Sequence, residues 1–234
     1  MIAREGAPFI VSGVLITLFA LWAAIRWDSW WLLAVTALVL LATLFTTFFF
    51  RDPPRRIAPH PDALLAPADG RILTVETVEN HAVFGGSAIK LSIFLSIFDV
   101  HINRMPFSGT IRHVSYHPGK FLAAYKDKAS DLNENTETHL ITSHGVPIVI
   151  RQIAGLIARR IVCRVQPGDT VTAGDRFGMI RFGSRTELIV PRDSEVCVKA
   201  GEHVRAGVTV VGKLKSREPL PAPLRSEQGR NAKL

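Results

Sequence analysis

Residues 176–191 of this 234-residue chain read RFGMIRFGSRTELIVP, two strand-like runs joined by a glycine-serine step. The first run ends at Phe182 and the second begins near Thr186, so Gly183-Ser184 stands at a bend between strands. Such a pair is ordinarily a hairpin turn. It also has the composition that self-cleavage by an acyl shift requires, because glycine tolerates strained backbone angles and the serine hydroxyl is a nucleophile. The rest of the chain has to distinguish a plain turn from a processing site.

Short runs of alternating apolar and polar residues fill most of the chain after residue 64, which is typical of half-buried strands. Turn-forming tetrapeptides separate them, namely PADG, FGGS, HGVP, QPGD and TAGD. Residues 165–175 are similar to the hammerhead turns of biotinyl and lipoyl domains, but no lysine at a hairpin tip is present to carry a prosthetic group. We therefore predict a mainly β, barrel-sandwich-like catalytic domain over residues 64–214, with one short helical stretch at 121–132.

Two uncharged stretches precede this domain, at residues 8–25 and 29–50. Each is close to the roughly 20 apolar residues with which a helix crosses a bilayer. Only residues 26–28 separate them, so residues 1–50 are predicted to form a membrane anchor, a hairpin of two transmembrane helices. A cleaved signal peptide is the alternative, but the first stretch lacks a small-residue cleavage site and a second apolar stretch follows directly. Four tryptophans suit an aromatic belt around the loop: Trp22, Trp27, Trp30 and Trp31.

The arginines predict how the hairpin is oriented. One arginine precedes the first helix and three follow the second, whereas the loop carries a single arginine beside an aspartate. The excess of positive charge at the outer ends predicts that both termini are cytoplasmic, with the anchor in the cell inner (plasma) membrane and the catalytic domain on its cytoplasmic side. Residues 51–63, rich in proline and arginine, are expected to form a linker, and residues 215–234 a disordered tail.

The formal net charge of +8 indicates an acidic partner. With an anchor present, the charge favours an anionic membrane surface, and no interleaved basic and aromatic pattern supports nucleic acid as a partner. The two cysteines, Cys163 and Cys197, form no Cys-x-x-Cys pair, and no set of zinc ligands stands out. We therefore expect neither a disulfide in the reducing cytoplasm nor a metal cofactor.

Five motifs occur along the chain in a recognisable order: FFFRDPPR at 48–55, PADG at 67–70, FDVHINRMPFSG at 98–109, YHPGKF at 116–121 and RFGSRTELIVP at 181–191. With this order and spacing the chain resembles the phosphatidylserine decarboxylases, in the short membrane-anchored form of the proenzyme. The likeness runs from about residue 48 to 214. It implies a lyase of phospholipid biosynthesis that converts phosphatidylserine to phosphatidylethanolamine, using a pyruvoyl cofactor made from its own chain.

The resemblance implies that the chain cleaves itself between Gly183 and Ser184. The Ser184 hydroxyl attacks the Gly183 carbonyl, and β-elimination from the resulting ester leaves dehydroalanine, which loses ammonia to become a pyruvoyl group. The products would be a β chain, 1–183, and an α chain, 184–234, that stay together through strand pairing. The ketone would form a Schiff base with the substrate amine and withdraw electrons as carbon dioxide leaves.

The resemblance also suggests which side chains move protons. Asp69 in PADG matches the family's processing aspartate, and it would orient a histidine as in a triad. His101 is the first candidate for that histidine. Longer family members have a second histidine three positions on, implicated in processing, where this chain has Arg104. His101 would then perform the tasks of both histidines, or His117 or His113 from the adjoining strand would replace the second one.

Basic residues are candidates for binding the charged headgroup. Arg104 could bind the substrate carboxylate or phosphate instead of taking part in processing. Lys120 and Arg151 could receive a phosphate, although exposed basic residues are common. These assignments depend on where the fold places each side chain.

Two other classes of protein fit parts of the sequence. A membrane-anchored zinc peptidase would use Asp69, His101 and another histidine as ligands, but neither a His-x-His pair nor a His-Glu-x-x-His motif is present. A non-enzymatic barrel-sandwich adaptor would carry the same fold. It gives no reason for the Phe-Gly-Ser context, and the long helical hairpin that such components often carry is missing.

Overall fold

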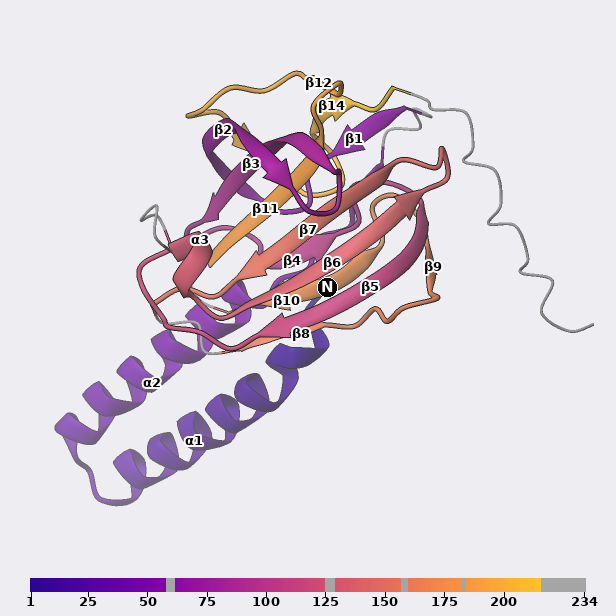
Figure 1. Ribbon diagram of the computed structural model, residues 1–234. Coiled ribbons are helices and arrows are strands. Elements are labelled where there is room, and N and C mark those ends of the chain that lie inside the picture. The colour runs from indigo at the N-terminus through magenta and orange to yellow at the C-terminus, as the bar shows by residue number, and fades with distance from the viewer. Residues whose placement is uncertain (58–61, 125–128, 157–159, 182–183, 216–234) are drawn as a thin grey trace, which may run out of the picture.

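The computed structural model describes residues 1–57, 62–124, 129–156, 160–181 and 184–215. A short 3-10 turn, η1 (Arg4–Gly6), is followed by two helices, α1 (Ala7–Arg26) and α2 (Trp30–Phe49). The helices lie side by side as a hairpin that projects from the β domain (Figure 1). Both are long and apolar enough to cross a membrane. The predicted disordered tail and part of the predicted linker fall outside the described residues.

In the described part of the β domain there are two three-stranded sheets and one eight-stranded sheet. Every strand pair among these described residues is antiparallel. The long sheet has the order β13-β2-β3-β11-β7-β6-β5-β9, and the small ones are β4-β10-β8 and β1-β14-β12. The strands of the described residues are β1 (Ala63–Leu65), β2 (Gly70–His81), β3 (Gly86–Leu95), β4 (Ile102–Arg104), β5 (Gly109–His117), β6 (Asn135–Thr142), β7 (Pro147–Ile153), β8 (Ile161–Cys163), β9 (Thr170–Val171), β10 (Arg176–Ile180), β11 (Ser184–Pro191), β12 (Glu195–Val196), β13 (His203–Val204) and β14 (Val210–Lys213).

The long sheet curls into a half-barrel around the main hydrophobic core (Figure 1). Strand β11 lies at its centre, between β3 and β7, and all of its residues are buried. Because side chains alternate along a strand, Ser184 shares one face of β11 with Leu188 and Val190, which belong to the core. Arg185 and Glu187 lie on the opposite face. The central strand therefore begins at the predicted cleavage site and buries both of its faces.

The mainly β prediction, with two apolar helices in front, is confirmed. The longer predicted runs correspond to β2, β3, β5, β7, β10 and β11. Helix is found only at Ala129–Leu132 (α3) within the predicted stretch 121–132, and residues 125–128 are outside the described part. Strands β1, β4, β9 and β13 have two or three residues each, too few for a periodic pattern to reveal them.

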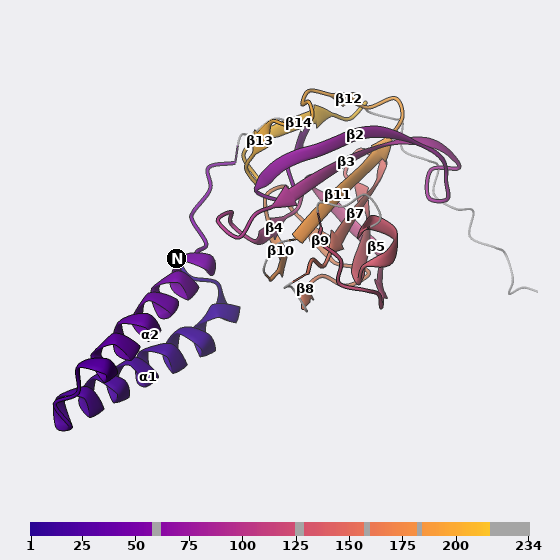
Figure 2. The ribbon, with the colours of Figure 1, turned by 90° about the vertical axis from the view of Figure 1, so that its left-hand side faces the viewer.

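The base of the hairpin packs against the small sheet β4-β10-β8. Phe49 and Phe50, at the end of α2, are buried with Val100, Ile102 and Met179 in a second apolar cluster. Figure 2 shows the hairpin leaving the domain on the side of β4 and β10. The helices are thus joined to the strands that lead to the predicted site.

Candidate active site

Ser184 is the first residue of β11, and it pairs with Leu95 of β3. The residue is fully buried. Its hydroxyl oxygen has no hydrogen-bond partner among the residues described. Gly183 and Phe182, the rest of the predicted cleavage site, lie outside the described part of the chain. A buried hydroxyl without a partner is uncommon in a native fold, because an unmade hydrogen bond costs about 1–3 kcal/mol, and it is available as a nucleophile.

His101 is brought to the same region by backbone pairing. It directly precedes β4, which pairs with β10, and the Ile180 N–H donates to the His101 carbonyl over 3.3 Å. Ile180 ends β10, four residues before Ser184. On the other side, residues 96–100 connect Leu95, the partner of Ser184, to His101. His101 and Ser184 therefore flank the short segment that contains the predicted cleavage site.

The surroundings of His101 favour a neutral imidazole. The residue is fully buried, and its ring lies against the Phe49 ring with 4.3 Å between centroids. Burial lowers the pKa of His101 from 6.5 to about 4. Nδ1 lies 3.0 Å from the Asp99 carbonyl oxygen, and because a carbonyl only accepts, Nδ1 carries the proton. Nε2 then holds the lone pair that a general base needs.

The acid stability of the protein tests this neutral imidazole. An unfolded histidine titrates near 6.5, whereas His101 in the fold titrates at about 4. Between these values the unfolded chain binds a proton that the folded chain does not, so the free energy of unfolding falls as the pH drops from 6.5 to 4. We expect a loss of about 3 kcal/mol, and a smaller loss for His101→Gln. Thermal unfolding in detergent at about pH 7 and about pH 4.5 measures it; equal losses in both proteins would contradict the assignment.

Asp69 lies in the PADG turn that leads into β2. The turn depends on Gly70, whose φ of 148° is rarely adopted by other residues and whose position leaves no room for a Cβ beside the Phe94 carbonyl. Asp69 is buried, and both carboxylate oxygens have partners. Oδ1 accepts from the Ala206 N–H at 2.8 Å, and Oδ2 accepts from Arg55 Nη2 at 2.7 Å. The carboxylate is therefore bound between a backbone amide and a guanidinium.

Comparison with known proteins identifies the family. The family profile described as "Phosphatidylserine decarboxylase" matches residues 42–212. The "Phosphatidylserine decarboxylase proenzyme" of Desulfotalea psychrophila is 44% identical over 213 residues, covering 91% of this chain and 96% of the relative. The proteins of the same name from Syntrophus aciditrophicus and Nitratidesulfovibrio vulgaris are 45% and 46% identical, over 90% and 91% of this chain and 96% and 94% of their own lengths.

The chain belongs to the phosphatidylserine decarboxylase family. The resemblance drawn from its five motifs is thereby confirmed, and the chain is identified as an enzyme of the decarboxylase class. The match includes Asp69, His101 and Ser184.

In this decarboxylase Arg104 forms a buried ion pair. Its Nη1 donates to the Gly174 carbonyl at 3.0 Å, and its Nη2 lies 3.2 Å from Asp52 Oδ1. Asp52 also pairs with Arg176 at 2.6 Å. Arg104 stands where longer family members are expected to have a second histidine. Through Asp52 it connects the linker after α2 to β4 and β10. Binding of the substrate by Arg104 stays a prediction.

The alternative histidines lie on β5. His117 is exposed, with Nε2 3.0 Å from Ser115 Oγ, and the ring of His113 lies 5.3 Å from that of His139. Strands β6 and β7 stand between β5 and β11 in the sheet. The structure therefore places His101, rather than His113 or His117, beside β10, the strand that leads to Ser184.

The sequence reasoning missed a buried polar cluster on the other face of β11. Glu187 is fully buried, and its Oε1 accepts from Ser130 Oγ at 2.6 Å. Arg185 Nη1 donates to the same Ser130 oxygen at 2.5 Å. Arg151, a residue that could receive a phosphate, lies 3.6 Å from Glu187 and 2.7 Å from Glu137. A glutamate inside the apolar run TELIV was the signal that could have revealed this cluster.

A second polar chain lies on the same face of β11 as Ser184. Asn103 Nδ2 donates to Thr186 Oγ1 at 3.1 Å, and Gln152 Nε2 donates to Asn103 Oδ1 at 2.8 Å. All three residues are buried. Since Thr186 is the next residue on the face of Ser184 and Asn103 follows His101 by two positions, these bonds fix the two strands relative to each other.

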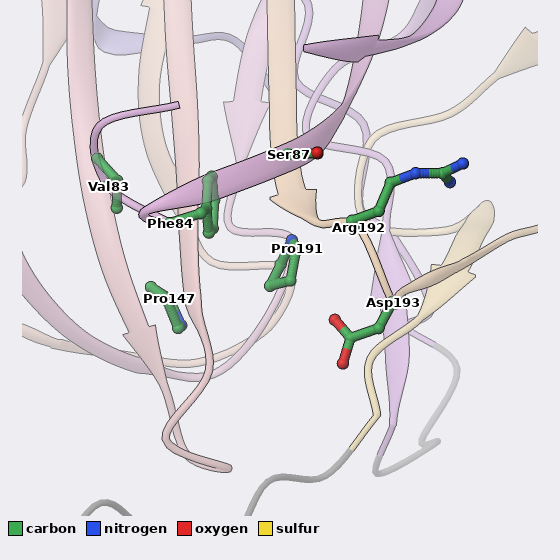
Figure 3. A pocket seen from close by; sticks show the side chains of 7 residues that line it. All are labelled: Val83, Phe84, Ser87, Pro147, Pro191, Arg192 and Asp193. Atoms are coloured by element: carbon green, nitrogen blue, oxygen red, sulfur yellow. The ribbon is translucent and has the colours of Figure 1, made fainter. Parts of the chain in front are cut away.

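Among the described residues, one cavity lies at the far end of β11 and another at the base of the hairpin. One, of about 380 Å³, is lined by Phe84, Pro147 and Pro191 among others (Figure 3). Pro191 is the last residue of β11, roughly 24 Å along the strand from Ser184, so this pocket is separate from the candidate site. The other, of about 320 Å³, lies at the hairpin base, where it is lined by Met1, Ile2, Ala3, Arg4, Asp52, Ile102, Arg164, Arg176 and Gly178. Within the described ranges no three His, Cys, Asp or Glu side chains are grouped so that they could hold a metal ion.

Proposed function

We propose that this family member converts phosphatidylserine to phosphatidylethanolamine with a pyruvoyl group formed at position 184 by self-cleavage of the Gly183–Ser184 bond. The observation that carries the proposal is the placement of Ser184. It is buried at the start of a central strand, and its hydroxyl has no partner among the described residues. The names of the relatives, which are proenzymes, support processing of a precursor.

Cleavage requires only groups of this chain and one water molecule. Ser184 Oγ adds to the Gly183 carbonyl carbon while its proton passes to His101 Nε2, and the amide nitrogen leaves with a proton, which gives an ester. Removal of the Cα proton of residue 184 then breaks the Cβ–O bond and releases the Gly183 carboxylate. The enamine left at 184 rearranges to an imine, and water replaces its nitrogen, which departs as ammonia. For Asp69 the proposal keeps the role that the resemblance implies, which is to orient the histidine as in a triad.

The residues at this position fit such a group. The pyruvoyl ketone would hold the substrate amine and accept the electron pair released with carbon dioxide. The burial of Ser184 shields the position from bulk solvent. The neutral His101 can hold a proton and return it to the substrate carbon. Strand β11 would remain paired with β3 and β7 after cleavage, so the α and β chains stay associated.

The α1–α2 hairpin is proposed to anchor the decarboxylase in the inner membrane, with the β domain on the cytoplasmic side. Apolar side chains are exposed along both helices, as lipid contact requires. Arg51 and Arg55 follow α2, which favours the cytoplasmic side and an anionic leaflet. A fluorescent protein fused after residue 234 should fold and fluoresce, whereas a periplasmic alkaline phosphatase in its place should be inactive. The reverse pattern would refute the orientation.

The proposed cofactor can be tested directly by mass spectrometry of purified protein. We expect a fragment that begins at position 184 and carries a ketone in place of the serine amine. Hydroxylamine should add to this fragment and abolish decarboxylation in proportion to the labelled fraction. An intact serine at 184 in fully active protein would overturn the proposal.

A further inference from the structure

The exposed apolar side chains of the β domain are unevenly distributed. Among the described residues from 62 to 215, the large apolar side chains that are exposed number five. Phe98 is 64% exposed, Leu156 63%, Tyr116 59% and Leu132 41%, while Val75 is at the threshold with 36%. A soluble domain scatters such residues singly, whereas a contiguous group marks an interaction surface.

The register of the long sheet places the first four of these at one end. His117, Asn135, Ile153, Arg185 and Phe94 form one row across β5, β6, β7, β11 and β3. Each of the four apolar residues lies near or beyond this row, in the direction in which Ser184 also lies. Val75 is in the body of β2 instead. We name the group of Phe98, Tyr116, Leu132 and Leu156 the apolar rim.

The hairpin is attached at this same end. Arg51, two residues after the end of α2, donates from Nη2 to the Phe98 carbonyl at 2.6 Å. Its guanidinium also lies over the Phe48 ring, 3.9 Å from the centroid. The Arg51 side chain, just after α2, is thus bonded to Phe98, the most exposed residue of the rim. Arg51 therefore joins the end of α2, at Phe48, to Phe98 of the rim.

Basic residues accompany the rim. Lys120 is exposed and its backbone pairs with that of Asn133, next to Leu132. Arg160 is exposed and its carbonyl accepts from the Arg181 N–H at 3.4 Å, close to the cleavage segment. Apolar and aromatic side chains mixed with basic ones are the composition that binds the surface of an anionic bilayer.

We propose that the apolar rim rests in the headgroup layer of the anionic bilayer that holds the hairpin, so that the end of the sheet containing Ser184 faces the lipid. The occupant is the membrane rather than another protein, because Arg51 bonds the rim to the end of an apolar helix that is long enough to cross a bilayer. The contact of the rim with the bilayer does not depend on the proposed function. A role of the rim in delivering lipid to Ser184 does rest on the proposed function.

Fluorescence quenching tests the seating without any assay of activity. The background is the full chain with Cys163→Ser and Cys197→Ser. Single cysteines are then introduced by Phe98→Cys or Leu156→Cys and labelled with an environment-sensitive dye. The labelled protein is placed in nanodiscs that contain phosphatidylglycerol. We expect blue-shifted emission that spin-labelled lipid quenches at least about threefold more than in the matched Val75→Cys control. Equal quenching at all three positions would overturn the proposal. A blue shift without lipid quenching at both rim positions would also overturn it, since it would indicate a protein partner or a second copy.

Kinetics test the role in lipid delivery. The double variant Phe98→Ser, Leu156→Ser should raise the KM for phosphatidylserine in nanodiscs by about tenfold. It should change turnover of a water-soluble, short-chain phosphatidylserine by less than about twofold, because no rim contact is needed there. Equal losses with both substrates would refute delivery by the rim. If the natural chain turned over neither substrate, the proposed function would fall, and the quenching result would still decide whether the rim is seated.

Discussion

Ser184→Ala is expected to leave the chain whole and without decarboxylase activity. Alanine has no oxygen to attack the Gly183 carbonyl, so neither the ester nor the pyruvoyl group can form. Because the proposed cofactor supplies the electron sink for the reaction, turnover should fall by at least about a million-fold, to the background rate. A denaturing gel should show one band in place of two, and headspace carbon dioxide from labelled substrate should be absent.

Ser87→Ala is the matched control for this result. Ser87 lies near the start of β3 and bonds to Glu79, at the opposite end of the sheet from Ser184. The control should yield both fragments and normal turnover. Two bands from Ser184→Ala, or decarboxylation by its uncleaved chain, would show that residue 184 is not the source of the cofactor.

His101→Ala is expected to have the second largest effect. Removing a general base costs about 10²- to 10⁴-fold in rate, so the precursor should accumulate and convert slowly. Added imidazole should accelerate this conversion, which a purely structural defect would not permit. The progress of cleavage after synthesis is followed by pulse labelling and gel electrophoresis.

The two histidines of β5 are the controls for His101. His113→Ala and His117→Ala should cleave at the normal rate, because β6 and β7 separate their strand from β11. Slow cleavage in His117→Ala with normal cleavage in His101→Ala would reverse the assignment and restore the alternative drawn from the sequence.

The sequence alone was sufficient for the longer strands and for the hairpin of two apolar helices. The signals for these elements are local, namely alternating residues in β2 and β3 and uncharged stretches in α1 and α2. They do not depend on distant parts of the chain. The family resemblance then pointed to Ser184 and His101. That these two residues flank one segment depends on the pairing of β4 with β10, and β4 has only three residues. A strand this short leaves no periodic signal.

The partners of the charged residues could not be predicted either. The sequence offered Arg151 as a residue that could receive a phosphate, and gave no sign of Glu137 and Glu187, which pair with it because three neighbouring strands place these side chains in one row. Glu187 belongs to a strand buried on both faces, where the apolar run suggested no charge. Cross-strand neighbours are set by register, and register is fixed by the whole sheet rather than by any single run.

The stacking of Phe49 on the His101 ring has a practical consequence for work on this enzyme. Trimming the chain before Arg51, the usual route to a water-soluble preparation, would strip that aromatic ring away together with Phe50. Water would then reach the imidazole, and its protonation behaviour would drift back toward that of a free histidine. The end of the α1–α2 hairpin therefore forms part of the surroundings of His101. In a shortened enzyme the pKa of this imidazole would differ from that in the full chain.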